Sequence, residues 1–479
     1  MKRKSFACLV LFSMTYCAIF GQVIGMGCVY SPDVDGKSPL RARQTTRSYT
    51  SIPTRYSLKK YCPTPKSQGN HGTCSSWSTT YAARTICEAM TNGWENRDSI
   101  TKAAFAPIFI YKQLDSSQDC QMGTSIGESL SLLESKGAPK YNDFSVQCAD
   151  YVPQCLFSKA DEYKISGYTK LFDDYNNGLT SSNYKIQSIK KSLSENHPVI
   201  IAMDVYDSFC HSWNKETWSG LKDGNPGYHA MCVVGYDDEK EGGAFEIMNS
   251  WGTDFGKGGF IWVKYKDLCE TVDFAYDMYL TQKAKPCPTP QPTVKQYSMS
   301  GDMRIVERDG GGTPIVINDP ATSLPYYYIN EDYPSGKKFR LIINNHEPAW
   351  VYIIASDKEN NVTKLFPYAD DISAYLNYSE NEIALPDEKH EFELDNTAGI
   401  DYFCVLYSQE ELDFNRLTEN IRRQPGTFYE KLRAALGDKL AKKEDVRYIM
   451  NEMGFSAKTD RPIVPLVVEI SHLDYLHQQ

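Results

Sequence analysis

The sequence predicts an α+β fold for its first domain and a mainly-β fold for its second, because runs with helical periodicity come first and strand-like runs follow. Helices are predicted at "CSSWSTTYAARTICEAM", at "TSIGESLSLLESKG", which Gly137 ends, and at "YKIQSIKKSLSEN". Strands are predicted at "PVIIAMDVY", "YHAMCVVGYD", "AFEIMNSWG" and "GGFIWVKY". The order of these elements indicates a helical part followed by an antiparallel sheet.

The second domain follows a proline-rich segment, "AKPCPTPQPTVKQ" at residues 284–296, which predicts a semi-rigid linker. This linker divides a domain of residues 52–283 from one of residues 297–479. In the second domain, strand-like runs ("KKFRLIINN", "AWVYIIASD", "IDYFCVLYS") alternate with turn residues. A helical stretch runs from Leu412 to about Met453, and "RPIVPLVVEIS" is the last strand. We expect a β-sandwich with a helical insertion.

Residues 1–21 have the build of a secretory signal peptide: a basic start, an apolar run ("FACLVLFSMTYCAIF") and a small residue, Gly21. The run is too short to span a bilayer securely, so we expect an exported, soluble protein with no transmembrane segment. A lipid anchor at Cys28 in "VIGMGC" is the alternative, although Gly25 stands where a lipidation motif usually has a branched apolar residue. Residues 22–51 are polar and basic without periodicity, which predicts a disordered leader or a short propeptide.

Charge and cysteine spacing argue against two kinds of site. The formal net charge is −10, and loss of the signal peptide removes three basic and no acidic residues, which makes it −13. An acidic protein argues against a nucleic-acid partner. None of the 14 cysteines has zinc spacing, so no metal and no cofactor is predicted. Some cysteines of an exported protein should pair, and for Cys148 and Cys155 in "CADYVPQC" a disulfide is favoured.

Cys74 is the candidate nucleophile, because it opens the first predicted helix, where the helix dipole favours the thiolate that attacks a carbonyl. Such a thiol also needs a base. His229 lies on a predicted strand, and Asn249 stands at the end of the next strand. A hairpin of that length brings both ends together, so the Asn249 amide oxygen can accept the imidazole N–H and fix the tautomer of the ring. We expect a resting pair of thiolate and imidazolium.

Gln68 supplies a third element of the predicted site. Its side-chain amide precedes the helix of the nucleophile and can act with the Cys74 backbone N–H to hold a developing oxyanion. Gly69 and Gly72 allow the chain to pass close by without steric cost. Trp251, two residues after the asparagine, is expected to cover the bond between His229 and that asparagine and to exclude water from it.

Three stretches together resemble the signature blocks of papain-like cysteine peptidases: "IPTRYSLKKYCPTPKSQGNHGTCSSWS", "GYHAMCVVGYD" and "NSWGTDFGKGGFIWVKY". The resemblance covers residues 52–283 and implies a two-lobed fold, one lobe helical and the other β-rich, with a cleft between them. It implies an exported bacterial peptidase that is periplasmic, secreted or held at the cell surface. The roles that it implies are the oxyanion glutamine for Gln68, the nucleophile for Cys74, the base for His229, the orienting asparagine for Asn249 and the shielding tryptophan for Trp251.

The sequence departs from the family pattern beside the nucleophile. His71 stands where a disulfide cysteine is usual, and the usual partner falls on Cys120, so that bridge is missing. Ser75 stands where the family has tryptophan, with Trp77 at a following aromatic position. We expect no long helical prosegment before Ile52. The resemblance also implies that Gly123 pairs with the substrate backbone. It implies an open, apolar pocket for the second residue before the scissile bond, lined by Ala202, Gly227 and Ala230.

Other interpretations of the same residues lead to other functions. A lone cysteine is more often a packed core residue, but here several pieces of one site coincide, which favours a catalytic role. The main hypothesis is a cysteine endopeptidase that acts on protein or peptide substrates. The alternatives are a catalytically silent peptide-binding protein and an enzyme that transfers the acyl group to an amine. The second domain resembles a bacterial accessory domain of unassigned function and shows no catalytic constellation.

Overall fold

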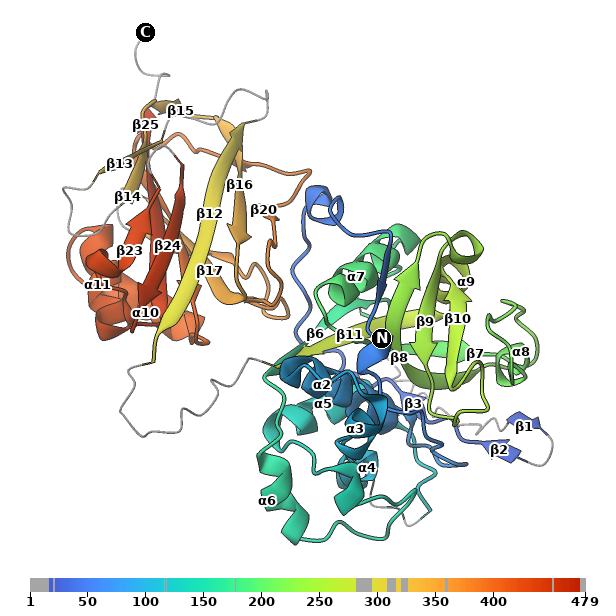
Figure 1. The fold of residues 1–479 in the computed structure, drawn as a ribbon. Coiled ribbons are helices and arrows are strands. Elements are labelled where there is room, and N and C mark those ends of the chain that lie inside the picture. The colour runs from blue at the N-terminus through green and yellow to red at the C-terminus, as the bar shows by residue number, and fades with distance from the viewer. Residues whose placement is uncertain are drawn as a thin grey trace, which may run out of the picture. The chain divides into compact units, whose positions relative to one another are not determined.

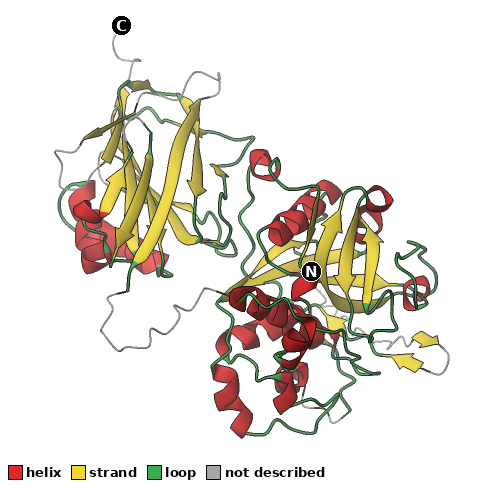
Figure 2. Cartoon of the chain, viewed as in Figure 1, coloured by secondary structure: helices red, strands yellow, loops and turns green. Residues whose placement is uncertain are grey.

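The structure, a computed structural model, describes residues 17–19, 22–115, 117, 119–176, 178–280, 295–307, 316–319, 326–357, 361–449 and 452–473. The described residues form two compact units, drawn in Figures 1 and 2. The first unit contains the residues up to Ser38 and those from Ile52 to the predicted linker, and the second contains Pro39–Ser51 and the residues after the linker. The predicted signal peptide and linker lie almost wholly outside the described residues. No helix in the described part is long and apolar enough to cross a bilayer.

The helical part of the first unit is built around a continuous helical segment that begins at Cys74. It consists of α1, a wider π-helical stretch at Trp77–Arg84, and α2. It ends at Gly93, whose φ of +66° is a left-handed conformation that favours glycine. α5 begins with a capping box, in which Ser125 and Glu128 each accept the other's backbone N–H. The helices are α1 (Cys74–Ser76), α2 (Thr85–Asn92), α3 (Arg97–Lys102), α4 (Pro107–Leu114), α5 (Ile126–Ser135), α6 (Cys155–Asp161), α7 (Ser182–Ser194), α8 (Asp207–Cys210) and α9 (Tyr265–Cys269).

The β-rich part of the first unit is an antiparallel sheet with the strand order β10-β9-β8-β7-β11-β6, and β4 pairs with β8. β8 carries His229, which is paired with Met203 on β7. The other neighbour of β8 is β9, which leads directly into Asn249. The strands of this sheet are β4 (Arg55–Ser57), β6 (Gly167–Asp173), β7 (Val199–Val205), β8 (Gly227–Asp237), β9 (Ala244–Met248), β10 (Phe260–Lys264) and β11 (Val272–Tyr279). Short strands outside it are β1 (Cys17–Ile19), β2 (Gln22–Ile24), β3 (Cys28–Val29) and β5 (Thr124–Ser125).

The second unit is mainly β, with two larger sheets among its described residues. One has the order β20-β16-β12-β24-β23 and the other the order β13-β14-β25-β22-β17-β18, and apolar side chains of both share a core. Its elements are β12 (Tyr297–Glu307), β13 (Val316–Asp319), β14 (Tyr326–Ile329), β15 (Tyr333–Pro334), β16 (Lys338–Asn345), β17 (Ala349–Ser356), β18 (Val362–Phe366), β19 (Tyr375–Leu376), β20 (Ile383–Leu385), β21 (Phe392–Glu393), β22 (Gly399–Ser408), α10 (Phe414–Arg423), α11 (Phe428–Leu436), β23 (Val446–Tyr448), β24 (Gly454–Thr459) and β25 (Ile463–Leu473). The predicted fold class, α+β followed by a mainly-β sandwich-like domain with a helical insertion, is confirmed.

The leader has a defined structure from residue 25 to residue 51, so the predicted disorder is not found there. The prediction rested on polar, aperiodic composition, but two small apolar side chains of the leader are buried. Cys28 is 5% exposed in the first unit, and Ala42 is 1% exposed in the core of the second. Asp35 is also buried, and it accepts hydrogen bonds from the Gly127 N–H and the Tyr276 hydroxyl, both at 2.9 Å. Tertiary contacts therefore order a segment whose composition alone indicates a flexible one.

A disulfide joins Cys120 to Cys148, so the predicted bridge between Cys148 and Cys155 is wrong. Cys155 is a free, exposed cysteine at the start of α6. Nearness in the sequence favours Cys155, but the fold brings Cys120 to Cys148 instead. Cys120 lies beside the loop that precedes Cys74, because the Gly72 N–H donates to the Cys120 carbonyl at 2.8 Å. The bridge therefore fixes the segment against which that loop is held.

We expect that Cys148→Ser will destabilise the first unit by about 3–4 kcal/mol, because the unfolded chain gains conformational entropy when the disulfide no longer closes a loop in it. In the folded protein, the substitution also frees the segment around Cys120, which lies beside the loop that precedes Cys74. The two cysteines are 28 residues apart in the sequence. Urea unfolding under non-reducing conditions measures the change. Cys155→Ser is the matched control, since that thiol is exposed and free, and it should leave the unfolding midpoint unchanged. Equal midpoints for the two variants would contradict the prediction.

Candidate active site

Cys74 is the first residue of α1 and its side chain is fully buried. Burial raises the pKa of the Cys74 thiol, because the thiolate is the form that desolvation penalises; backbone N–H groups of Ala230 and Gly27 act in the opposite direction. Ala230 follows His229 on β8, so this contact brings the thiol of α1 to the strand of the predicted base. Gly27 belongs to the leader, so the leader also reaches the thiol.

The imidazole of His229 is held by Asn249, as the hairpin predicts. Its Nε2 lies 2.9 Å from Asn249 Oδ1, which also accepts the Ser250 backbone N–H at 2.7 Å. Among the described residues the buried Nδ1 has no hydrogen-bond partner. The indole of Trp251 stacks on the imidazole, with ring centroids 4.6 Å apart and an angle of 26° between the planes. The asparagine therefore fixes the ring at Nε2, the indole covers it, and Nδ1 is left for another partner.

Burial lowers the pKa of His229 to about 4, and the hydrogen bond to Asn249 opposes that shift. Since burial also raises the pKa of Cys74, both groups favour their neutral forms. The structure therefore differs from the expected resting pair of thiolate and imidazolium. The physical reason is that both side chains are fully buried, so water stabilises neither charge.

Both the nitrogen and the oxygen of the Gln68 side-chain amide form hydrogen bonds. Its Nε2 donates to the His71 carbonyl at 2.8 Å and to the Gly25 carbonyl at 3.1 Å. Its Oε1 accepts the Ser250 hydroxyl at 2.5 Å. Ser250 thus links the predicted oxyanion residue to Asn249, whose side chain accepts the Ser250 backbone N–H. Sequence analysis missed this residue, although its place within "NSWG" was a signal that pointed to it.

Residues 25–29 of the leader lie across these groups. β3 pairs with β5 in a parallel register, Cys28 opposite Thr124, and the Thr124 N–H donates to the Gly27 carbonyl at 2.8 Å. β3 also packs against β8, so it contacts both the helical part and the β-rich part of the unit. The Gly25 N–H points to the Gly69 carbonyl at 3.4 Å. Because Cys28 is almost fully buried here, an acyl chain on its sulfur requires a different position of the leader.

The candidate substrate-binding residues lie around this segment. A Cβ on Gly123 would come within 3.0 Å of the Gly27 carbonyl, so the leader passes directly over that glycine. Ala202 on β7 and Ala230 on β8 face each other across the ladder and are fully buried. Gly227 is the first residue of β8. The four positions are thus beside β3 or on the two strands next to the nucleophile, and their role in substrate binding stays a prediction.

The two departures from the family pattern have local explanations. The Ser75 hydroxyl is buried and donates to the Thr124 carbonyl at 2.6 Å, so it ties α1 to the strand that pairs with the leader. His71 Nδ1 lies 3.5 Å from Gln121 Nε2. The loop that lacks the usual disulfide is therefore held by polar contacts to the segment around Cys120, which is itself bridged to Cys148.

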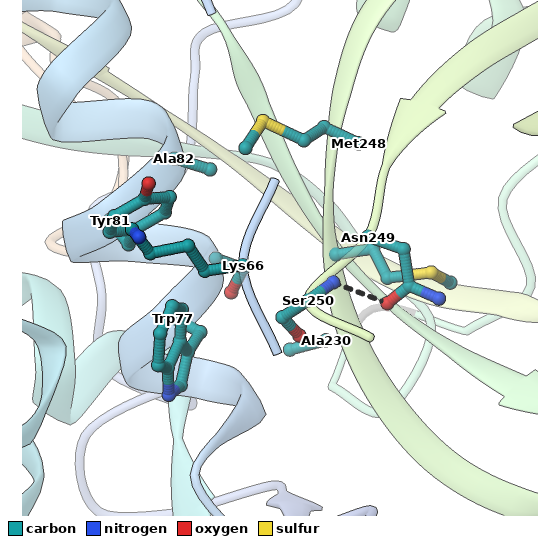
Figure 3. A pocket seen from close by; sticks show the side chains of 10 residues that line it. Lys66, Trp77, Tyr81, Ala82, Ala230, Met248, Asn249 and Ser250 are labelled. Atoms are coloured by element: carbon teal, nitrogen blue, oxygen red, sulfur yellow. Dashed lines mark hydrogen bonds between the residues drawn. The ribbon is translucent and has the colours of Figure 1, made fainter. Parts of the chain in front are cut away.

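A small pocket lies between the helical and β-rich parts, close to the asparagine (Figure 3). In Figure 3, Trp77 and Tyr81 project from the helical segment on one side, and Asn249 and Ser250 stand on the other. Trp77 is buried and packs on Tyr81, with ring centroids 5.1 Å apart. The aromatic residue three positions after Cys74 therefore packs in the interior of the helical part.

We expect that stability will fall as the pH drops from about 6.5 to about 4, in part because of His229. With a folded pKa of about 4, lower than the unfolded value of 6.5, the unfolded chain binds more protons in that window, so acid favours unfolding. The contribution is about 3 kcal/mol. Urea unfolding of the parent and of His229→Gln at pH 7 and pH 4 measures it, and tryptophan fluorescence reports mainly on residues 52–283, which hold six of the seven tryptophans. Parallel losses in the two proteins would contradict the prediction.

Two family models match this chain. Residues 51–278 match the model described as papain family cysteine protease. Residues 332–411 match a domain of unknown function (DUF4384). The first match begins one residue before the first unit resumes at Ile52 and ends within β11. It includes Gln68, Cys74, His229 and Asn249.

Known proteins similar to this chain are distant from it. A cathepsin B-like cysteine proteinase 1 of Ostertagia ostertagi is 29% identical over 98 residues, which is 20% of this chain and 28% of that protein. An uncharacterized peptidase C1-like protein, L477, of Acanthamoeba polyphaga mimivirus is 21% identical over 240 residues, 48% of this chain and 74% of that protein. Xylellain, a cysteine protease from Xylella fastidiosa, is a structural relative at 19% identity and a TM-score of 0.43, covering 54% of this chain and 96% of that one.

The match to the family model and the arrangement of helices and sheet in the first unit agree with each other. The chain spans little more than a quarter of the length of the Ostertagia relative. Residues 51–278 of this chain are therefore similar to the papain family of cysteine proteases, whose family model they match.

Proposed function

We propose that this protein is a cysteine endopeptidase that cleaves protein or peptide substrates with Cys74 as nucleophile. The observation that carries the proposal is the linked set of side chains in the first unit. Asn249 holds His229 at Nε2, the thiol lies against the residue that follows this histidine, and Ser250 connects Asn249 to Gln68. Such a set provides a nucleophile, a base and an oxyanion donor in one place.

In the proposed reaction the Cys74 sulfur attacks the carbonyl carbon of the scissile bond, and its proton passes to His229 Nδ1. The developing oxyanion is held by Gln68 Nε2 and the Cys74 backbone N–H. His229 then gives its proton to the leaving amine, which leaves a thioester on Cys74. Water, activated by the same imidazole, hydrolyses the thioester and restores the thiol. Asn249 and Trp251 keep the imidazole oriented and dry through both steps.

The leader is proposed to be a short propeptide. It engages two of the groups that the reaction needs: the Gly25 carbonyl accepts from Gln68 Nε2, and the backbone of Gly27 favours the thiolate of Cys74 and so opposes the rise of its pKa. A substrate carbonyl requires the same donor and the same sulfur. The arrangement with the leader in place is therefore a latent form, in which burial keeps thiol and imidazole neutral.

Covalent labelling of the full chain tests the proposal. An epoxide-type thiol inhibitor should attach to Cys74, and peptide mapping by mass spectrometry identifies the labelled residue. The exposed thiol of Cys155 provides the internal comparison, because a reaction governed by accessibility alone labels that cysteine first. Label on Cys155 with none on Cys74, after the leader has been displaced, would exclude Cys74 as the nucleophile.

A further inference from the structure

We propose that the C-terminal unit is a peptide-binding domain whose ligand is the second half of the leader, and that it thereby keeps the first half in the cleft. The inference rests on the proposed function, in which residues 25–29 block Cys74. The leader-binding face, as it is called below, is formed by Asp371, Ile372, Ser373, Asn377, Tyr378, Asn381, Glu382 and Glu388. All of these residues lie within the match to the domain of unknown function.

The leader binds this face through its backbone. The Leu40 N–H donates to the Asp371 carbonyl at 2.6 Å, and the Ser373 N–H donates to the Leu40 carbonyl at 2.8 Å, so Leu40 forms a parallel bridge with Ile372. Further along, the Thr45 N–H donates to the Glu382 carbonyl at 2.8 Å. Backbone bonds of this kind give affinity to an extended peptide without requiring a particular side chain.

Side chains of the leader add specificity. The guanidinium of Arg41 lies 3.9 Å from the ring centroid of Tyr378 and donates to Asn377 Oδ1 at 3.2 Å. Gln44 Nε2 donates to Asn381 Oδ1 at 2.5 Å. Arg41 and Gln44 are only 8% and 4% exposed. Long polar side chains are this buried when a partner surface has been shaped for them.

Two carboxylates of the face receive the next leader residues. Glu382 Oε2 accepts the Thr45 hydroxyl at 2.7 Å. Glu388 accepts both the backbone N–H and the hydroxyl of Thr46, each at 2.8 Å. Together with Ala42 in the core of the unit, these contacts make the leader part of the domain's packing. The ligand that fits is a basic segment with small and hydroxyl side chains, as in "LRARQTTRS", which turns into a 3₁₀ helix at Thr46–Tyr49.

The peptide bond between Ser38 and Pro39 connects the half of the leader on this face to the half in the cleft. A ligand that is held at one end returns to its second site at a high effective concentration, which raises its apparent affinity about 10²- to 10⁴-fold without any new contact. The C-terminal unit therefore strengthens the block at Cys74 by holding residues 40–48. A cut after Ser51 leaves both halves bound, so it does not by itself open the cleft.

Hydrogen exchange of the full-length chain tests the inference without relying on activity. In a Cys74→Ala background, the double variant Arg41→Ala, Gln44→Ala should increase the exchange rate of residues 25–38 by about tenfold or more, measured by mass spectrometry. Lys37→Ala is the charge-matched control, because its side chain is exposed and pairs with Asp33 of the leader itself. A second variant, Glu388→Gln, weakens the face at an exposed position and should give a smaller increase of the same sign.

Three outcomes separate the two proposals. Faster exchange of residues 25–38 in the double variant, with no change in Lys37→Ala, supports the inference. Exchange equal to that of the control in both the double variant and Glu388→Gln overturns it, because the cleft half is then held by its own contacts alone. If exchange rises but Cys74 of the corresponding wild-type-nucleophile variants never reacts with the epoxide inhibitor, the proposed peptidase function fails while the leader-binding role stands.

Discussion

Cys74→Ala should lower the kcat of peptide hydrolysis by about 10⁴- to 10⁶-fold, since alanine cannot form the thioester and the remaining donors stabilise no covalent intermediate. The loss should fall on kcat and leave substrate binding nearly unchanged, because Cys74 is the first residue of α1 and alanine keeps that helix intact. A fluorogenic peptide library gives the rates, with the leader removed in both proteins. Labelling by the epoxide inhibitor should disappear in parallel.

Cys155→Ser is the matched control for this prediction, and it should keep both full activity and full labelling, because that cysteine is exposed and lies on α6. Residual turnover in Cys74→Ala close to that of the parent would contradict the proposed nucleophile. Tight peptide binding without turnover in the parent would favour a silent binding protein instead. Product analysis with an added amine separates hydrolysis from acyl transfer, because both pass through the same thioester.

The positions of the residues proposed to react could be predicted from the sequence, because they follow from short-range rules. A polar turn before a helical run places Cys74 at a helix start. Strand alternation and hairpin length place His229 beside Asn249, and the observed Nε2 to Oδ1 distance is 2.9 Å. These statements depend on local pattern and on one strand pairing, so a single sequence contains enough information to make them.

The path of the leader could not be predicted in the same way. Its contacts join residues that are far apart in the chain, such as Asp35 with Tyr276 and Arg41 with Tyr378. The polar, aperiodic sequence of the leader contains no pattern that predicts these partners, and its composition alone indicates disorder. The predicted bridge between Cys148 and Cys155 was wrong for a related reason. Spacing in the sequence says little about which thiols the fold brings together, and here the fold joins Cys148 to Cys120. The long-range packing of short segments is therefore the part that needed the structure.

Replacing both leader glycines, in Gly25→Ala, Gly27→Ala, should raise the initial rate of peptide hydrolysis by the uncut chain about 10²- to 10³-fold. A Cβ on Gly25 would come within 3.0 Å of the His71 backbone, and one on Gly27 within 3.0 Å of the Gly72 backbone. Backbone atoms cannot turn away as a flexible side chain does, so each substitution should weaken the leader by about 1–3 kcal/mol. Each 1.4 kcal/mol corresponds to a tenfold change in the equilibrium constant between the bound and the displaced leader.

The glycine variants also decide what the leader does, because neither glycine contributes a side chain to the proposed chemistry. Displacement of the leader returns Gln68 Nε2 and the Cys74 sulfur to the solvent side of the cleft, where water lowers the pKa of the thiol from its buried value. Epoxide labelling of Cys74 should therefore accelerate together with hydrolysis, while Lys37→Ala, an exposed change in the same leader, should alter neither rate. Unchanged rates in the double glycine variant would mean that residues 25–29 do not limit access to Cys74. A mature chain that begins at Cys28 would lack both glycines. Full activity of that chain without any further cleavage would favour the lipid-anchor alternative over a propeptide.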